Sequence, residues 1–112
     1  MTNLSHSTVW VDDQLVDTNQ AQLHIASSAV LYGLSVYTVF PVNKTPDGMA
    51  AFRLRDHFNR LLESARIVGI DTFAPAWTYA RFEEAVRQLA KANKLEDDVF
   101  VRATVHVDEL VP

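Results

Sequence analysis

The hydrophobic residues of this chain change their spacing along its length, from alternate positions to helical intervals and back. The stretch 34–42 (LSVYTVFPV) is apolar at every second position, and one face is shared by Leu34, Val36, Thr38, Phe40 and Val42. This alternation predicts a strand with one buried face. Pro41 has no N–H to donate to a neighbouring strand, so we expect that end of the strand to lie at a sheet edge.

Helical spacing follows over residues 51–70. Apolar residues recur there at positions i, i+4, i+7, i+8, i+11 and i+14, which are Leu54, Phe58, Leu61, Leu62, Ala65 and Val68. This stripe predicts an amphipathic helix. Gly69 is a suitable C-terminal end, because glycine adopts the left-handed conformation at little cost. A second stripe on the same helix is polar and carries His57, Arg60 and Ser64.

Shorter patterns predict the rest of the fold. They indicate a hairpin of strands at 8–12 and 14–17, a helical turn at 29–33, a return strand at 49–53, a second helix at 79–93 and a last strand at 99–107. This order predicts an α+β fold, an antiparallel β-sheet with two α-helices packed on one face. Residues 1–8 are predicted to form a flexible N-terminus, and residues 9–112 one domain.

Composition narrows the class of protein. The chain has 112 residues, 48% of them hydrophobic, which suits one domain with an ordinary core. It has no cysteine, which excludes disulfides, thiolate zinc sites and cysteine nucleophiles. The net charge of −4 argues against a nucleic-acid partner. Neither a signal peptide nor a run of membrane-spanning length is present, so we expect a cytoplasmic protein without a membrane partner.

The sequence predicts no catalytic residue and no metal site. Its three glycines are isolated, so no glycine-rich phosphate loop is present, and its four histidines lack metal-ligand spacing. The three lysines are Lys44, Lys91 and Lys94. Lys44 lies in a predicted turn and the other two lie late on a polar helix face or just beyond it. None has the apolar setting that lowers a lysine pKa for imine chemistry.

One candidate binding surface remains. On the predicted last strand, Phe100 and Arg102 share the face opposite the valines. Tyr32 closes the predicted helical turn, and Tyr37 points off the apolar face of its own strand. Aromatic walls with one arginine suit a small carboxylate ligand with an apolar body. The alternative is structural: Phe100 and Tyr37 pack beneath a helix or another subunit, and Arg102 forms a surface ion pair.

Arg60 is the second candidate. Its guanidinium can act as a forked ligand for a phosphate or a carboxylate. The alternative is a solvent-exposed ion pair with Asp56, four residues earlier on the same helix. The spacing of the residues alone does not decide between the ligand role and the ion pair.

Three separated segments carry a family pattern. The first is VWVDDQLVD followed by LYGLSVYTVF, the second is AAFRLRDHFNRLLESARIVGI, and the third is ANKLEDDVFVRATV. In this order they resemble the small N-terminal domain of class IV (fold type IV) pyridoxal-phosphate aminotransferases, with the branched-chain amino acid aminotransferases the most similar. The resemblance extends from about residue 9 to 107.

The resemblance implies a cofactor, pyridoxal 5′-phosphate, and assigns its phosphate to Arg60. It places Tyr32, Tyr37, Phe100 and Arg102 along the substrate pocket, with Arg102 pairing with the distal carboxylate of glutamate or 2-oxoglutarate. The intact enzyme would move an amino group between a branched-chain or related amino acid and 2-oxoglutarate, as a homodimer. This hypothesis expects Arg60 to point into a cleft shared with the two tyrosines.

Two departures from the family pattern leave alternatives open. After YG the family usually continues F-E-G-x-R, whereas this chain reads YTVFP at 37–41. The small domain of a D-amino acid aminotransferase or of an aminodeoxychorismate lyase is therefore an alternative. The family's cofactor-holding lysine and the acidic partner of the pyridine nitrogen lie in a C-terminal domain that this chain does not match. We expect a fragment that is inactive alone, or else a stand-alone, non-catalytic domain that binds a ligand or partner.

Overall fold

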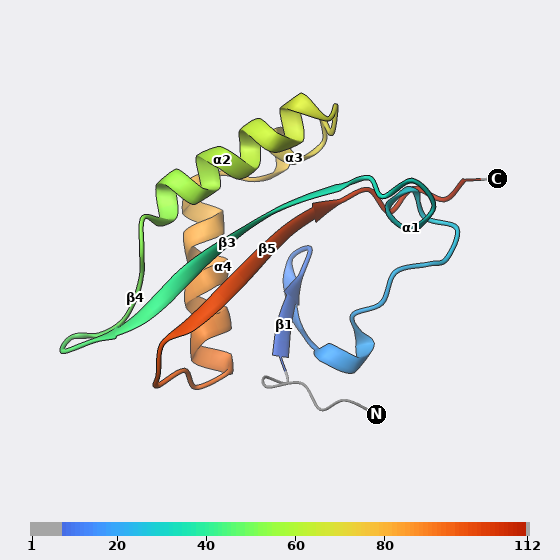
Figure 1. The fold of residues 1–112 in the computed structure, drawn as a ribbon. Coiled ribbons are helices and arrows are strands. Elements are labelled where there is room, and N and C mark those ends of the chain that lie inside the picture. The colour runs from blue at the N-terminus through green and yellow to red at the C-terminus, as the bar shows by residue number, and fades with distance from the viewer. Residues whose placement is uncertain (1–7, 112) are drawn as a thin grey trace.

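The computed structural model describes residues 8–111 and has the predicted α+β fold (Figure 1). Residues 1–7, which make up most of the predicted flexible N-terminus, and residue 112 lie outside the described part. The elements are β1 (Thr8–Val11), β2 (Gln14–Asp17), a 3-10 turn η1 (Thr18–Gln20), α1 (Ser28–Tyr32), β3 (Ser35–Thr45), β4 (Gly48–Ala51), α2 (Leu54–Ile67), α3 (Phe73–Ala76), α4 (Tyr79–Ala92) and β5 (Val99–His106).

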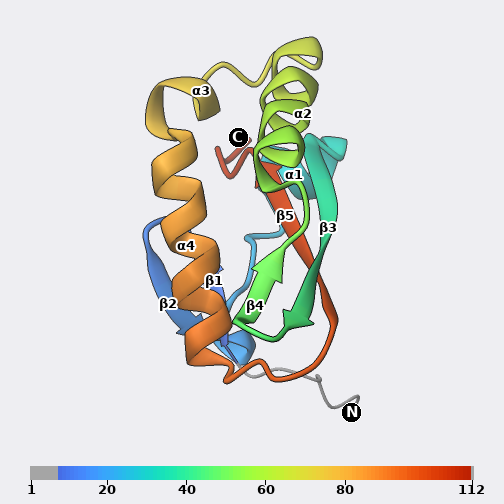
Figure 2. The same cartoon turned by 90° about the vertical axis from the view of Figure 1, so that its left-hand side faces the viewer.

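The strands form a three-stranded antiparallel sheet in the order β4-β3-β5 and a separate β1-β2 hairpin. Helices α2 and α4 cover one face of the larger sheet (Figure 2). Three rings join the layers, since Phe82 of α4 lies 6.0 Å from Phe40 of β3 and 5.1 Å from Phe58 of α2, measured between ring centroids. The predicted packing of both helices on one face is therefore confirmed.

The alternation predicted for β3 is also confirmed. Thr38, Phe40 and Val42 are buried against the helices, whereas Tyr37 and Val39 are exposed on the opposite face. Phe40 is fully buried. The strand thus separates an apolar core from a second face that no described helix covers.

The edge position predicted from Pro41 is wrong, because β3 is the central strand of the sheet. In an antiparallel strand the N–H and C=O of one residue point to the same side. The carbonyl of Pro41 accepts a hydrogen bond from the Phe52 N–H (2.9 Å) on the β4 side. The missing N–H of Pro41 also faces that side, just beyond the last strand pair, Val42 with Ala51. A central strand tolerates proline here because its neighbour has already ended.

Helix α2 is shorter than the predicted 51–70, and its ends have clear causes. Arg53 precedes it in the left-handed conformation, with φ of 51°. At the other end Gly69 adopts φ of 85°, and its N–H donates to Arg66 while the Ile70 N–H donates to Ala65. These two bonds form a Schellman motif, which supports the predicted role of Gly69. The predicted apolar stripe is largely buried, at Leu54, Phe58, Leu61 and Ala65.

Polar contacts that the sequence pattern did not indicate attach the β1-β2 hairpin to α4. The Asn93 side chain accepts from the Thr8 N–H (3.2 Å) and donates to the Thr8 carbonyl (2.9 Å). At the other end Arg81 donates to the Asp12 carbonyl (3.3 Å) and stacks on Trp77, with 4.0 Å from Cζ to the ring centroid. The hairpin is thus fixed at both ends of the helix.

The segment after β5 holds α1 in place. The N–H of Ser28 donates to Glu109 (2.9 Å) and the N–H of Ala29 to Val107 (2.8 Å), while the Ser27 side chain caps the helix. Gly33 ends α1 with φ of 63°, as the predicted helical turn requires. Within residues 8–111, the helices are too short or too polar to cross a membrane.

Candidate functional site

The face of the sheet opposite the helices carries most of the predicted pocket residues. Tyr37 and Val39 of β3 lie there beside Phe100 and Arg102 of β5. Phe100 is 79% exposed and Tyr37 is 57% exposed. Large apolar side chains left this exposed mark a surface that binds something or is covered by another part of a protein.

Arg102 and Tyr37 form a close pair on this face. Tyr37 is opposite Thr104 in the β3-β5 register and Val39 is opposite Arg102, so Arg102 lies diagonally from Tyr37. The Arg102 Cζ lies 4.2 Å from the centre of the Tyr37 ring. This cation–π contact orients the guanidinium along the sheet and leaves its N–H donors available to a ligand.

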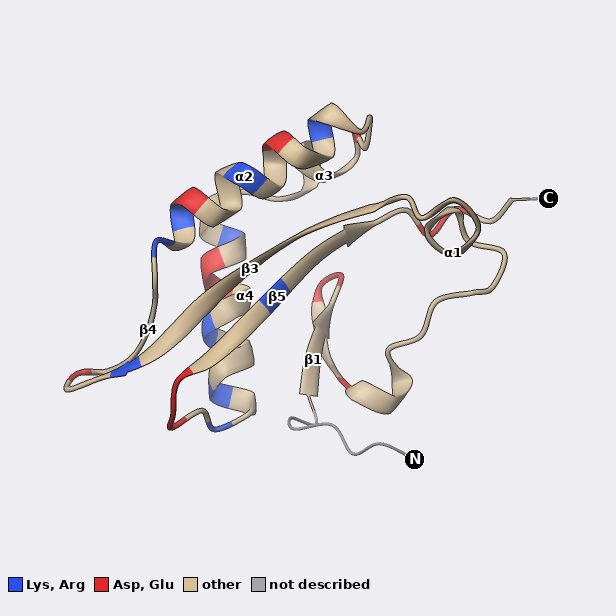
Figure 3. Ribbon diagram, viewed as in Figure 1, with Lys and Arg blue, Asp and Glu red and all other residues tan. Residues whose placement is uncertain are grey.

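Of the structural alternatives, neither a covering helix nor an ion pair of Arg102 is found among the described residues. No helix lies over Phe100 or Tyr37 in the described part of the chain, because α2 and α4 pack on the other face (Figure 2). Within residues 8–111, Arg102 forms no ion pair. Arg102 is the one lysine or arginine of β5, and Figure 3 shows how the charged residues are spread over the other elements. Burial by another subunit stays an open prediction.

Tyr32 lies at a different place from this pair. It is the last residue of α1 and is 70% exposed, next to the exposed Val30 and Leu31. Figure 1 shows α1 beyond the end of β3 and β5, next to the C-terminus of the described chain. The described contacts do not join Tyr32 to Tyr37, so residues 8–111 alone do not form the expected common cleft.

Arg60 is exposed on α2 and has no polar partner among the described residues. The alternative pair with Asp56 does not form, because Asp56 accepts instead from Arg53 at 2.7 Å. Helix α2 covers the core side of the sheet, whereas Tyr37 projects from the other side. The expected cleft shared by Arg60 with Tyr32 and Tyr37 is thus not formed by residues 8–111 alone, and the phosphate role of Arg60 stays a prediction.

The polar stripe of α2 is anchored to β3 by His57. Its Nδ1 lies 3.0 Å from Thr38 Oγ1, and its ring centroid lies 5.7 Å from that of Phe40. Strand β4 pairs with β3 only over residues 42–45, so residues 35–40 of β3 have an open edge on that side in the described chain. The contact to Thr38 therefore fixes His57, one member of the polar stripe, against β3.

Replacing Thr38 with valine tests this anchor. Valine keeps the shape but leaves the His57 nitrogen without its partner, so we expect a loss of about 1–2 kcal/mol in the free energy of unfolding. Thr104→Val is the matched control, because Thr104 lies on the exposed face of the sheet. Urea unfolding of both variants measures the difference. Equal stability of the two variants would mean that the Thr38–His57 contact contributes nothing.

The comparisons with known proteins agree with this fold. No family model matches the chain. A branched-chain-amino-acid aminotransferase of Pseudomonas aeruginosa is 33% identical over 99 residues, which is 87% of this chain and 30% of that protein. One from Salmonella typhimurium is 28% identical over 110 residues, 98% of this chain and 34% of that protein.

Solved structures of branched-chain aminotransferases share the fold of this chain. The branched-chain aminotransferase of Thermoproteus uzoniensis, crystallised with norvaline, superposes with a TM-score of 0.86 at 30% identity, covering 96% of this chain and 35% of that one. By sequence and fold, this chain matches the small domain of branched-chain aminotransferases. The Escherichia coli enzyme superposes with a TM-score of 0.82 at 25% identity, covering 92% of this chain and 34% of that one. The chain spans about one third of the length of these relatives.

The structure adds three residues to those that the resemblance assigned. Val39 belongs to the exposed face of β3 and β5, and His57 and Thr38 belong to the polar stripe of α2 and its contact with β3. Val39 joins the exposed aromatic face, and strict alternation along β3 was enough to place it there. His57 and Thr38 are added because a hydrogen bond between their side chains connects the polar stripe of α2 to β3. The helical stripe contained His57, but no sequence signal paired it with a residue nineteen positions earlier.

Proposed function

We propose that this chain is the small domain of a longer, pyridoxal-phosphate-dependent branched-chain aminotransferase. The observation that carries the proposal is the match over nearly the whole chain, in sequence and in fold, to enzymes of that name. The longer protein would transfer an amino group between a branched-chain or related amino acid and 2-oxoglutarate. The relatives named above are branched-chain aminotransferases, so they do not favour a D-amino acid aminotransferase or a lyase.

In this proposal the exposed face of β3 and β5 is one wall of the substrate pocket. Tyr37, Val39 and Phe100 contact the aliphatic side chain of an amino acid, and Tyr32 closes one end of the pocket once the rest of the protein is in place. Arg102 binds the distal carboxylate of an acidic substrate through charge-assisted hydrogen bonds. One surface can then accept both substrate types, because the aromatic rings and the guanidinium lie side by side.

The cofactor phosphate is assigned to Arg60. Its guanidinium offers five N–H donors, and the described residues engage none of them in an ion pair. This free fork suits a dianionic phosphate, and the contact of His57 with Thr38 holds its helix against β3. When bound, pyridoxal phosphate supplies the electron sink for the reaction, while protein groups bind and orient it. One solved branched-chain aminotransferase that shares the fold is complexed with N-(5′-phosphopyridoxyl)-L-glutamate.

No lysine of this chain is assigned to the cofactor. Lys44 lies near the β3-β4 turn, and Lys91 and Lys94 lie at the C-terminal end of α4, so none is on the Arg60 stripe. We propose that the covalent attachment comes from the rest of the longer protein, which also covers the exposed apolar residues of α1. A homodimer in the cytoplasm is part of the same proposal.

Donor profiling of the longer protein tests the assignment. We expect transfer from leucine, isoleucine and valine to 2-oxoglutarate, followed as glutamate formed, and little transfer from D-alanine. Preference for D-alanine would contradict the branched-chain assignment, and no transfer from any donor would favour a non-catalytic binding domain. As a control, the 112-residue chain alone, treated with pyridoxal phosphate and borohydride, should carry no specific adduct by mass analysis. An adduct on Lys44, Lys91 or Lys94 would contradict the attachment proposal.

A further inference from the structure

Val39 lies at the centre of the exposed face of β3 and β5. It is opposite Arg102 in the register, with Tyr37 two residues before it on the same face and Phe100 diagonally across. Val39 is 37% exposed, less than either aromatic residue beside it. A valine is also shorter than an aromatic side chain. Val39 therefore forms the floor of this face between two taller rings.

The hydrogen-bond pattern of the β3-β5 ladder brings Val39 close to Arg102. The Val107 N–H donates to the Leu34 carbonyl at 3.1 Å, so these two residues form a hydrogen-bonded pair. The two kinds of pair alternate along an antiparallel ladder, which makes Val39 and Arg102 a non-hydrogen-bonded pair. Side chains lie closest together in pairs of this kind. The valine and the arginine are therefore adjacent parts of one wall.

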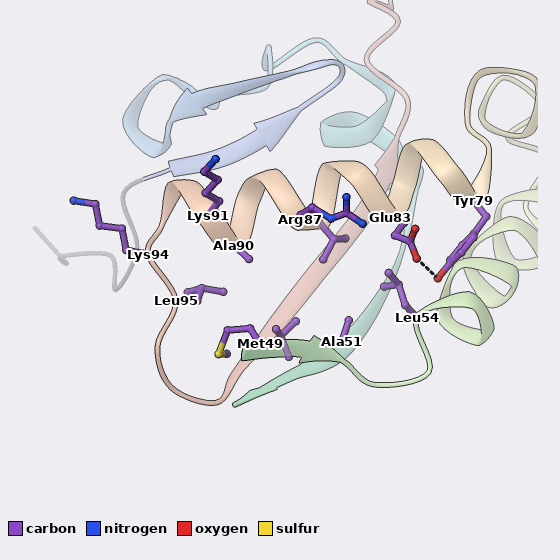
Figure 4. Close-up of a pocket in the computed structure, with 12 residues that line it drawn as sticks. Met49, Ala51, Leu54, Tyr79, Glu83, Arg87, Ala90, Lys91, Lys94 and Leu95 are labelled. Carbon is purple, nitrogen blue, oxygen red and sulfur yellow. Dashed lines mark hydrogen bonds between the residues drawn. The ribbon is translucent and has the colours of Figure 1, made fainter. Parts of the chain in front are cut away.

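The sheet cannot recede beneath Val39. Its chain neighbours Thr38 and Phe40 are buried on the helix side, and Phe40 is fully buried. A hollow of about 550 Å³ does lie on that side, between α4 and β4, whose outer edge pairs with no described strand (Figure 4). The one residue of β3 that lines this hollow is Val42. The hollow therefore adds no space under Val39.

The Val39 side chain has little freedom to move aside for a larger ligand. A side chain branched at Cβ is restricted at χ1, so the two methyl groups of a valine hold their positions. The family pattern F-E-G-x-R has a glycine at this position, and Pro41 stands where that pattern has its arginine. Arg102 is the one lysine or arginine on this face of β3 and β5. The wall thus combines a fixed apolar floor with a single cation.

We propose that Val39 limits the length of the substrate side chain, so that the pocket accepts side chains ending at the δ position and rejects aromatic ones. This inference rests on the proposed function, because it takes the face of β3 and β5 as the substrate wall. Leucine ends in δ-methyl groups and glutamate in a δ-carboxyl group, so their side chains have the same length. Val39 and Arg102, being adjacent, can receive these two ends at one place. The ring of phenylalanine continues past the δ position and meets the valine methyl groups.

Binding of two unreactive carboxylates tests this limit without turnover. The probes are 4-methylpentanoate, which carries the side chain of leucine, and 3-phenylpropanoate, which carries that of phenylalanine. Each is titrated into the longer protein loaded with cofactor, and the visible absorbance of the cofactor reports the dissociation constant. We expect the wild-type protein to bind 4-methylpentanoate more tightly. Val39→Ala should reduce the ratio of the two dissociation constants by about tenfold, the lower end of the range for one methylene group in an apolar pocket.

Three further variants make this test specific for size. Val39→Thr keeps the branched shape, so the ratio should stay at the wild-type value. Val39→Phe raises the floor and should weaken binding of both carboxylates. Val68→Ala is the matched control, because it shortens another exposed valine, at the end of α2, and it should leave the ratio unchanged. Circular dichroism confirms the fold of each variant.

The possible outcomes separate this inference from the proposed function. An unchanged ratio in the Val39→Ala protein, when the wild-type protein transfers the amino group of leucine, would overturn the role of Val39 alone. Tighter binding of 3-phenylpropanoate than of 4-methylpentanoate by the wild-type protein would overturn the length limit. If the wild-type protein neither binds the two carboxylates nor transfers from leucine, the proposed function fails and the inference fails with it.

Discussion

Replacing Phe58 with alanine should lower the free energy of unfolding by about 3–5 kcal/mol, the range measured for large-to-small changes of buried aromatic residues. Phe58 is 3% exposed. Its ring centroid lies within 6.1 Å of those of Phe73, Tyr79 and Phe82, so it joins α2 to the segments that follow it. Alanine would leave a cavity where α2 and α4 meet above the sheet. Denaturant unfolding followed by far-UV circular dichroism measures the loss.

Phe52→Ala is the control for this prediction. Phe52 is 58% exposed and lies between β4 and α2, so its removal creates no internal cavity. We expect a change below about 1 kcal/mol, as for surface substitutions away from special backbone positions. A loss in Phe58→Ala no greater than that in Phe52→Ala would mean that the aromatic cluster does not hold the two helices together.

The second large effect is expected at Arg60 in the longer protein. Arg60→Ala should weaken retention of pyridoxal phosphate by roughly 10- to 100-fold, because a hydrogen bond to a charged group contributes about 1.5–3 kcal/mol. Turnover at saturating cofactor should fall much less, since the phosphate takes no part in the chemistry. The measurement is cofactor dissociation, followed by visible absorbance during dialysis and by the dependence of activity on added cofactor.

Two further variants make the Arg60 test specific. Arg60→Lys keeps the charge but loses the fork, so it should restore only part of the affinity. Arg66→Ala removes an arginine from the same helix that is paired with Glu63, and it should leave cofactor retention unchanged. Equal cofactor affinity in the Arg60→Ala and Arg66→Ala proteins would count against the phosphate role. It would not affect the fold assignment, which rests on the whole chain.

The regular elements were predictable where one physical pattern dominated. The alternation in β3 and the stripe of α2 identified the buried residues Phe40, Phe58 and Leu61 correctly, because burial on one side imposes a fixed spacing on apolar residues. Gly69 marked the end of α2 because few other residues adopt its left-handed conformation readily. The aromatic and basic residues of the exposed face were also found by alternation, although it could not show that Arg102 stacks on Tyr37.

Other features depended on contacts between distant segments, and local patterns do not encode them. Pro41 indicated that strand pairing is interrupted at its position. Only the sheet order and the β3-β4 register showed that this position lies in the central strand, just beyond the end of β4. The helical stripe placed His57 and Arg60 together, yet the partner of His57 comes from β3. The sequence predicts Asn93 only as the end of a helix, whereas its side chain also holds the first strand.

The sequence by itself determined the α+β class, the two helices on one face, most of the core residues and the resemblance to branched-chain aminotransferases. These follow from hydrophobic periodicity and from motifs that are contiguous in the chain. Tertiary structure decided that Arg60 and Tyr37 lie on opposite sides of the sheet, that Arg102 rests on an aromatic ring, and that β4 has a free edge beside a hollow. Periodicity fixes which face of its own element a side chain occupies. It does not fix which other element is brought against that face, because that depends on how all the elements pack together.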